Sequence, residues 1–326
     1  MDDLERRWRE SDLRSRERRS ARRAAPRRWP AQVGFAGAAA AVLGVAIALA
    51  TSSGAGDSPS NVVASTESAL PVLADFAFEP PAPARDRDRH QDRERHPRTV
   101  PTADAIDAAS TYAAERGGLA SFATIDSEGR LRGRDVNQLY SAASVVKAMV
   151  LAAELRRLAE ERQPIDPETD SLLGAMIRFS DNEAADAVYA RVGDAGMHAV
   201  AKRAGMTGFE IAGHWGNAQI TAADMARFFA DLEGVLPARH REYGQSLLGS
   251  VIPSQSWGIP VAAGERWAAR FKGGWLPDHA LVHQAAELRE RHGPRQISIA
   301  ILTDEQPSHG YGVETVEGIA ERLLGG

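Results

Sequence analysis

The order of secondary-structure elements expected over residues 101–326 predicts an α/β (α+β) domain. Three observations support this: two short apolar segments come first, a long stretch with helical periodicity follows, and three β-rich segments precede a last helix. The predicted strands are, in chain order, 119–125, about 130–140, 267–273, 280–286 and 296–303. We therefore expect one sheet built from both ends of the domain, with helices between its two parts.

The connections and helix ends carry local signals. Residues 126–129 (DSEG) supply a turn between the first two strands. The first helix ends at the glycine pair 117–118. Another helix begins at Thr221, whose hydroxyl can cap it while Asp224 returns the bond. The expected helices cover 103–116, about 144–161, several segments within 168–250, and about 312–324.

The composition narrows the class of protein. With 326 residues, of which 43% are hydrophobic, the chain can bury a substantial core, and its net charge of -5 gives no general attraction to nucleic acid. The absence of Cys excludes disulfides, cysteine nucleophiles and Cys-ligated metals. The chain also lacks H-E-x-x-H, phosphate-binding Gly loops and G-x-S-x-G, so we expect no metal and no cofactor. Only Lys147, Lys202 and Lys272 are Lys, which, unlike Arg, can lose its charge in a folded protein.

The first hundred residues predict a membrane anchor and a spacer. Residues 1–32 form a basic leader, and 33–50 are eighteen uncharged residues, just enough for a bilayer-spanning helix. The basic flank places the leader in the cytoplasm, so the catalytic domain is expected outside a single-pass cell membrane. Residues 51–100, rich in Pro and alternating charges, are expected to form a disordered linker. The alternative is a cleaved export signal, because Ala48-Leu49-Ala50 has the A-x-A form and Arg27-Arg28 allows a twin-arginine signal.

The apolar helix that begins near Ser144 carries the first chemical motif. Apart from Ser144 and Lys147, every residue from Ala142 to Ala153 is apolar, which is typical of a buried helix. The two polar residues are three positions apart and therefore share one face. A buried Lys must be partnered or neutral, and a helix start favours negative charge. These conditions favour an activated serine nucleophile over the alternative, a capping Ser beside a surface Lys.

Two further motifs follow. The sequence SDN at 180–182 lies where one predicted helix ends and the next, 183–192, begins. Taken alone, it is equally consistent with a polar loop that caps a helix. The sequence KGGW at 272–275 lies at the end of a predicted strand, where Gly lets a ligand approach the backbone closely. An ordinary turn at a strand edge is the alternative for this motif.

In this order, the three motifs resemble the S-x-x-K, S-D-N and K-T-G set of class A β-lactamases and penicillin-binding proteins. The likeness extends over about 105–326. It implies that Ser144 attacks a carbonyl and is acylated, that Lys147 is the base or part of the proton path, and that Ser180 passes a proton to the leaving nitrogen. These three residues are the catalytic residues that the resemblance assigns.

The resemblance also implies a set of binding residues. Asn182 would hold the amide side chain of the substrate, and Lys272 would supply positive charge at its carboxylate and support Ser180. Gly274 and Trp275 would belong to the substrate-binding strand, and the backbone N–H groups of Ser144 and Trp275 would form the oxyanion hole. The implied ligand is a β-lactam or a peptidoglycan stem peptide ending in D-Ala-D-Ala. The implied fold is a five-stranded antiparallel sheet beside a helical lobe, with the site between them.

Three features depart from the family pattern. Gly273 stands where the family has Thr or Ser, whose hydroxyl helps to bind the substrate carboxylate. The first two motifs lie only 36 positions apart, so part of the helical lobe is expected to be trimmed. The segment 208–220 lacks the family's deacylating Glu followed by Leu-Asn, and its only ionisable residues are Glu210 and His214. We therefore expect acylation but not fast deacylation.

One alternative to an enzyme is a binding or sensory module of the cell envelope that uses the same pocket without turnover. Gly273 and the missing Glu favour it, whereas the intact Ser144, Lys147 and Ser180 favour an enzyme. A structural envelope protein is a third possibility, supported only by the long linker. The remaining His residues are scattered singly and are expected to be structural or exposed; they include His214, His279, His283 and His309.

Overall fold

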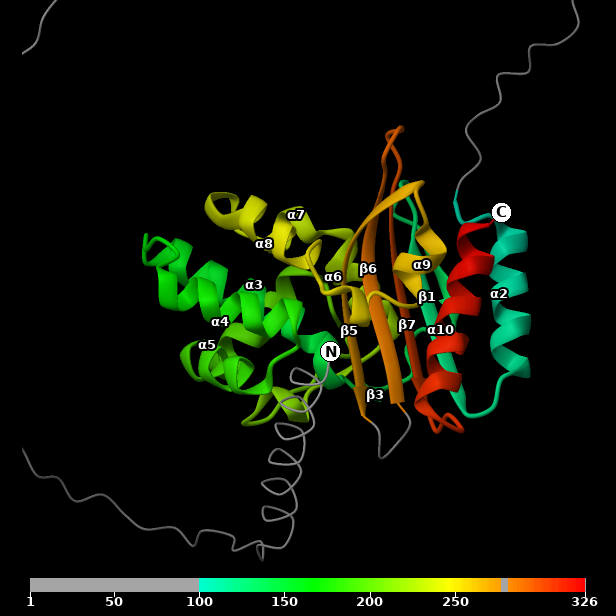
Figure 1. Cartoon of the computed structure of the whole chain (residues 1–326), viewed down its shortest axis with the longest axis horizontal. Helices are drawn as coiled ribbons and strands as arrows, with labels where there is room; N and C mark the ends of the chain where they lie inside the picture. The colour runs from blue at the N-terminus through cyan, green and yellow to red at the C-terminus, as the bar shows by residue number, and fades with distance from the viewer. Residues whose placement is uncertain (1–99, 277–280, 326) are drawn as a thin grey trace, which may run out of the picture. The chain divides into compact units, whose positions relative to one another are not determined.

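The computed structural model of the chain describes residues 100–276 and 281–325 (Figure 1). The predicted leader and membrane anchor lie outside these residues, as do positions 51–99 of the predicted linker, and their roles stay predictions. Among the residues that the structure describes, no helix is long and apolar enough to cross a bilayer.

Five antiparallel strands form the main sheet in the order β2-β1-β7-β6-β5. They are β1 (Leu119–Ile125), β2 (Leu131–Arg134), β5 (Trp267–Leu276), β6 (Leu281–Glu290) and β7 (Gln296–Asp304). Along the whole of β1 the chain pairs with β7, and Phe122 lies opposite Ile301. This pairing confirms the prediction of one sheet built from both ends of the domain. It also leaves β5 at an edge of the sheet.

Two strands run further than their sequence predicts, and one is shorter. β5 continues past residue 273 to Leu276, and β6 continues past residue 286 through polar positions, where Glu287 lies opposite Arg270 and accepts from it at 2.7 Å. This cross-strand ion pair lets charged residues occupy strand positions, which hides the strand pattern. The second predicted strand ends early at Arg134, because Asp135 has a positive φ of 48°.

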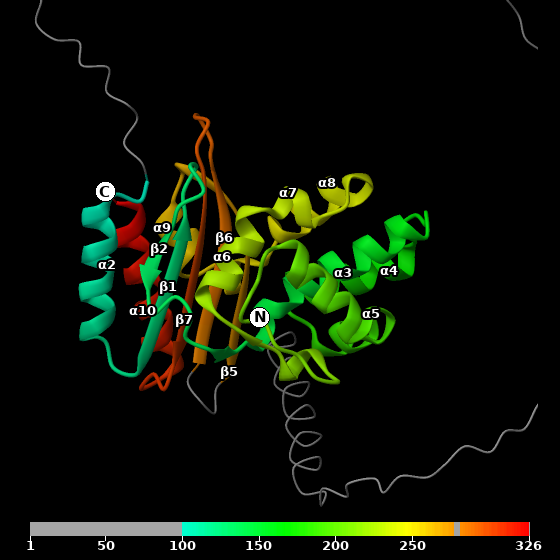
Figure 2. The same cartoon turned by 180° about the vertical axis from the view of Figure 1, so that it is seen from behind.

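Helices cover both faces of the sheet (Figure 2). Helices α2 (Ala103–Glu115) and α10 (His309–Leu324) pack together against one face, and α6 (Ala222–Ala230) packs against the other. As a result, β6 and β7 are buried along nearly all of their length. The predicted capping box of α6 is confirmed, since Thr221 accepts from Asp224 N at 3.0 Å and donates its own N–H to Asp224 at 3.3 Å.

The segment between the two halves of the sheet forms the helical lobe, seen beside the sheet in Figure 1. Its longer helices are α3 (Lys147–Glu160), α4 (Pro167–Arg178), α5 (Asn182–Arg203) and α8 (Arg241–Leu248). The shorter elements are β3 (Tyr140–Ser141), η1 (Ala143–Val146), η2 (Trp215–Asn217), β4 (Gln219–Ile220), α7 (Leu232–Val235), η3 (Ala238–His240) and η4 (Pro253–Gln255). Helix α9 (Ile259–Ala263) comes from the same segment but packs against α10 and the strands β5 and β6. Helix α5 breaks at Gly193, where φ is 56°, one residue beyond the predicted helix end.

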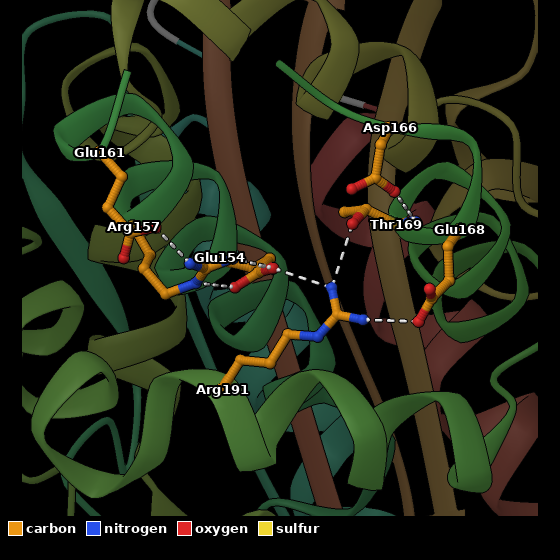
Figure 3. A network of polar contacts seen from close by, with 7 residues as sticks. All are labelled: Glu154, Arg157, Glu161, Asp166, Glu168, Thr169 and Arg191. Atoms are coloured by element: carbon orange, nitrogen blue, oxygen red, sulfur yellow. Dashed lines mark hydrogen bonds and ion pairs between the residues drawn. The ribbon is translucent and has the colours of Figure 1, made fainter. Parts of the chain in front are cut away.

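A buried carboxylate joins the three main helices of the lobe (Figure 3). Glu154 of α3 is fully buried and accepts two hydrogen bonds from Arg157, at 2.7 and 2.9 Å. Arg191 of α5 donates to Glu154 at 3.3 Å and also contacts Thr169 and Glu168 of α4, at 3.0 and 3.2 Å. These contacts fix the spacing of α3, α4 and α5, the helices that carry or flank two of the three motifs.

Replacing the buried charge should destabilise the domain. Glu154→Gln keeps the shape of the side chain but removes the charge that two guanidinium groups share, so we expect a loss of about 2 kcal/mol in the free energy of unfolding. The matched control is Glu161→Gln, an exposed partner of Arg157 at 2.7 Å, which should cost less than about 0.5 kcal/mol. Urea unfolding of both variants measures the difference, and equal costs would contradict the role given to Glu154.

Candidate active site

Ser144 lies on a tight turn between β3 and α3. The turn is the 3₁₀ helix η1, so the prediction that Ser144 begins a helix is confirmed, with a 3₁₀ turn at the start. Ala143 just before it has a φ of 45°, in the left-handed region, and Ala142 N donates to Ala218 O at 2.9 Å. Ser144 is half-buried, whereas the other residues of η1 are buried. This turn therefore presents the serine at the surface of an otherwise closed segment.

A buried histidine anchors the chain just before this turn. His283 of β6 is fully buried, and its Nε2 lies 3.0 Å from the carbonyl oxygen of Ser141. Its Nδ1 accepts from Thr303 N at 3.1 Å, so the proton is on Nε2 and is donated to Ser141. Burial lowers the pKa of His283 to about 4. The neutral ring thereby ties the start of the nucleophile turn to the centre of the sheet, which agrees with the structural role expected of this residue.

Lys147 occupies the first turn of α3 and is fully buried. Its Nζ donates to the carbonyl oxygen of Ser180 at 2.5 Å and to Asn182 Oδ1 at 2.6 Å. The amine also lies 4.8 Å from the centre of the Trp215 ring, a contact that favours a cation. The expectation that a buried Lys in this apolar helix has polar partners is thus confirmed, and the partners come from the SDN motif.

Ser180 joins the two buried lysines. It lies between α4 and α5 with a φ of 59°, a conformation that costs a non-glycine residue roughly 1 kcal/mol. Its carbonyl oxygen accepts from Lys147, and its hydroxyl accepts from Lys272 Nζ at 3.0 Å. The next residue, Asp181, caps α5 through Ala184 N at 2.7 Å. Both interpretations of the SDN segment therefore apply: Asp181 caps a helix, and Ser180 contributes to the polar site.

Lys272 is fully buried on β5, and two glycines follow it in the KGGW motif. Its Nζ also donates to Gly273 O at 2.8 Å. Burial lowers the pKa of Lys272 to about 7, so the amine is near half protonation at neutral pH. The motif lies within β5, which continues to Leu276, rather than at the strand's end as the sequence predicts.

Gly274 allows β5 to approach the nucleophile turn. A Cβ atom at this position would lie 2.6 Å from Ser144 N and 2.7 Å from Val145 N, so only Gly fits. Lys272 and Gly274 are two positions apart on one strand and share a face. Because Gly274 contacts the Ser144 turn while Lys272 bonds to Ser180, the strand brings the first and second motifs together.

The structure thus gathers the predicted residues from η1, α3, the α4–α5 junction and β5. For Trp275 the resemblance assigns a role to the backbone N–H. The structure also shows its ring, which packs against the rings of Trp257 and His309 with centroids 6.2 and 6.0 Å away. Sequence reasoning did not single out Trp257 as a site residue. It lies eighteen positions before Trp275 in the segment QSWGIP, and no local pattern predicts their contact.

The segment 208–220 does not supply an obvious water activator. Glu210 is exposed, and its backbone pairs with Gln219 of β4. His214 Nδ1 accepts from Gly216 N at 3.0 Å, so its proton is on Nε2, which lies 2.9 Å from Asp186 Oδ1. Both ring nitrogens are therefore engaged in holding the segment against α5. The expectation that neither residue takes the place of the family's Glu agrees with these contacts.

Comparison with known proteins agrees with this geometry. The profile of a beta-lactamase enzyme family, Beta-lactamase2, matches residues 101–325, more than half of the chain. The chain belongs to this β-lactamase family. The match begins where the sequence predicts the globular domain to begin, and it confirms the resemblance to β-lactamases and penicillin-binding proteins.

Solved structures of β-lactamases share the fold. A β-lactamase from Sphaerobacter thermophilus superposes with a TM-score of 0.60 at 16% identity, over 68% of this chain and 95% of that chain. PBP-A gives 0.60 at 16% identity, over 70% and 97%. A class A β-lactamase from Mycobacterium abscessus gives 0.60 at 19% identity, over 68% and 98%. At these identities the likeness establishes the fold alone. No curated protein sequence is significantly similar to the chain.

The close approach at Gly274 predicts a strong effect of one added methyl group. Gly274→Ala should push β5 away from Ser144 N and reduce acylation of Ser144 by a penicillin at least about 100-fold, since such displacements misalign reacting groups. Gly174→Ala in α4, where a Cβ atom meets nothing within 4 Å, is the control and should react like the wild type. Stopped-flow acylation rates test this, and a wild-type rate for Gly274→Ala would contradict the packing.

The buried His283 predicts a loss of stability in acid. The unfolded chain binds a proton at this residue below about pH 6.5, whereas the folded chain does so only below about pH 4. Stability from this group is therefore fully present above about pH 6.5 and falls by about 3 kcal/mol as the pH drops to 4. Urea unfolding of wild type and His283→Gln at several pH values should show a shallower pH dependence in the variant. Identical slopes would exclude this role.

Proposed function

We propose that this member of the β-lactamase family is a serine hydrolase that β-lactams or peptides ending in D-Ala-D-Ala acylate at Ser144. The observation that carries the proposal is the buried polar chain from Lys147 through Ser180 to Lys272, which lies against the turn that presents Ser144. A half-exposed serine three positions before one buried amine, with a second buried amine joined to it through Ser180, provides conditions that activate a nucleophile.

In the acylation step, Ser144 Oγ bonds to the carbonyl carbon and the C–N bond of the lactam or peptide breaks. The serine proton passes to Lys147, which must be neutral to accept it. A neutral amine still has two N–H groups, enough to keep the bonds to Ser180 O and Asn182 Oδ1, and its lone pair is then available. Ser180 accepts from Lys272, so its own hydroxyl hydrogen can move to the leaving nitrogen while the Lys272 ammonium returns a proton to Ser180 Oγ. The step then ends with the Ser144 proton on Lys147 and with Lys272 neutral.

The binding roles follow the same contacts. Asn182 Oδ1 accepts from Lys147, so its Nδ2 group is the part of the amide that can donate to a substrate carbonyl. A carboxylate near Lys272 would favour the ammonium form and restore the charge that burial disfavours. The N–H groups of Ser144 and Trp275 would hold the developing oxyanion, and the close approach at Gly274 supports this arrangement.

We expect slow deacylation. In the family's class A enzymes a Glu orients the hydrolytic water, and in this chain His214 and Glu210 of the corresponding segment are engaged elsewhere or exposed. The acyl-enzyme should therefore persist. This favours a slow hydrolase or a D,D-peptidase of the cell wall over an enzyme that destroys antibiotics rapidly.

The second candidate is a catalytically weak or inactive sensory or binding module of the cell envelope. Gly273, which lacks the hydroxyl that binds a carboxylate, favours it. The two buried lysines favour the enzyme, because desolvating an amine costs stability and a module without chemistry gains nothing from Lys272 at a pKa of about 7. In both cases the predicted anchor at 33–50 would hold the domain on the outer side of the cytoplasmic membrane.

A fluorescent penicillin tests the proposal. The full-length chain is incubated with it, and intact mass is followed over time, with Ser144→Ala as the control. We expect a persistent adduct on the wild type and none on Ser144→Ala, since slow deacylation leaves the ester in place. An adduct that disappears while the antibiotic is consumed would instead indicate a true β-lactamase. No adduct with penicillin or with a D-Ala-D-Ala peptide would rule out the hydrolase and favour the binding module.

A further inference from the structure

Three aromatic side chains from separate parts of the chain meet beside the KGGW motif. Trp257 follows η4, Trp275 lies on β5, and His309 is the first residue of α10. Their ring centroids are 6.0 to 6.3 Å apart, and each pair meets at 68° to 88°. This edge-to-face geometry is the favourable one for aromatic contacts. The two Trp rings are half-buried and His309 is exposed, so the aromatic cluster (Trp257, Trp275 and His309) presents a ring surface to solvent.

Trp257 lies against the position of Gly273. A Cβ atom at Gly273 would be 3.6 Å from the Cη2 and Cζ2 atoms of the Trp257 ring, an ordinary van der Waals contact. The resemblance to the K-T-G motif places a Thr or Ser hydroxyl at this residue. In this chain, therefore, an indole ring stands next to the point where that hydroxyl would begin.

The backbone of Trp257 is held in place by buried groups. Gln284 of β6 lies directly opposite Gly273 and is fully buried. Its Nε2 donates to Trp257 O at 2.7 Å, and its Oε1 accepts from Ile259 N at 2.6 Å. Gly258 between them has a φ of 69°, and a Cβ atom there would lie 2.7 Å from Gln284 Oε1. The backbone that carries the indole is thus held to β6 by buried hydrogen bonds.

The aromatic cluster is next to the reacting groups. Gly273 lies between Lys272, which bonds to Ser180, and Gly274, which contacts the Ser144 turn. Side chains alternate along β5, so Lys272 and Gly274 face Ser180 and the Ser144 turn, whereas Gly273 and Trp275 face Trp257 on the other side of the strand. Because β5 is an edge strand, a substrate that lies along its free edge can contact both sides, and its leaving group would reach the cluster next to the Lys272–Ser180 pair. His309 is exposed at its outer side, but partial desolvation beside the two indole rings lowers its pKa below the ordinary value, so it adds no charge at neutral pH.

We infer that the aromatic cluster is a leaving-group subsite that binds an apolar ring of the acyl donor in place of a carboxylate. The inference rests on the proposed function, since it requires acylation at Ser144. It assigns as preferred substrates uncharged esters, thioesters or amides whose leaving group carries an aromatic or similar flat apolar ring. Gly273 leaves room for this ring beside Trp257, whereas a Thr would return a hydroxyl suited to a carboxylate.

Two thioesters with one acyl group test the inference: N-acetyl-D-alanyl benzyl thioester and N-acetyl-D-alanyl thioglycolate. In each, Ser144 Oγ bonds to the acyl carbon, the C–S bond breaks, and the serine proton ends on the released thiol. A chromogenic thiol reagent reports release without background from the protein, because the chain has no Cys. Intact mass confirms acylation of the full-length chain, and Ser144→Ala is the control for both donors.

We expect the burst-phase acylation rate of the wild type, measured before the deacylation step that both donors share, to be at least about tenfold higher with the benzyl donor than with the thioglycolate. A ring–ring contact favours the benzyl group, and Gly273 lacks the hydroxyl that helps to bind a carboxylate. Trp257→Leu should reduce the benzyl rate about fivefold and leave the thioglycolate rate unchanged. Gly273→Thr should shift the ratio of rates about tenfold toward the thioglycolate. His309→Ala, at the exposed start of α10, should lower the benzyl rate in the same direction and provides a second test if Trp257→Leu proves unstable.

Equal rates for the two donors in the wild type, unchanged in Trp257→Leu or His309→Ala of normal melting temperature, would overturn the inference while the proposed function stood. A preference for the thioglycolate would overturn it as well. If neither thioester nor penicillin acylated Ser144, the proposed function would fail and this inference with it.

Discussion

Two fully buried lysines share one serine, and the site depends on this arrangement. Lys147 and Lys272 come from the helical lobe and the sheet, and each donates to Ser180, one to its carbonyl oxygen and the other to its hydroxyl. Burying an amine is costly unless acceptors are supplied. The acceptors come from a residue in a left-handed conformation between two helices, with Asn182 and Gly273 O completing the set. The lobe and the sheet are therefore joined by the groups that would carry the chemistry.

The rest of the domain holds these groups in register. Glu154 lies seven residues beyond Lys147 on the same face of α3 and bonds to Arg191 of α5, so the two helices are connected at two levels. On the sheet side, Gly274 lets β5 touch the Ser144 turn, and His283 on the neighbouring strand holds the chain before that turn. Glu154, Gly274 and His283 contact the elements that hold the reacting groups, so we regard them as positioning residues.

The sequence predicts the local features of this molecule and the order of its main elements. A helix apolar on all sides except for Ser144 and Lys147 predicted a buried, partnered lysine, and the structure supplies the partners. The sheet built from both ends followed from the order of the elements. The support of Ser180 by Lys272, 92 positions away, follows only from the resemblance, and the structure shows this contact. What the sequence could not show were contacts between distant residues that no motif links, such as Trp257 beside Gly273. The full length of β6 was also hidden, because its last four residues include charged ones, such as Glu287 paired with Arg270, where strand patterns expect apolar residues.

The small number of lysines allows a direct test of the central claim that burial beside Ser180 tunes Lys272. With ¹⁵N at Nζ, the chain should give three lysine signals, from Lys147, Lys202 and Lys272, of which the exposed Lys202 is the reference. NMR titration of wild type and Ser180→Ala assigns the effect. The account predicts that the Lys272 signal titrates near pH 7 and shifts in Ser180→Ala, while the Lys202 signal is unchanged. A Lys272 signal that titrated near about pH 10, the ordinary value for lysine, and ignored the loss of the Ser180 hydroxyl would contradict it.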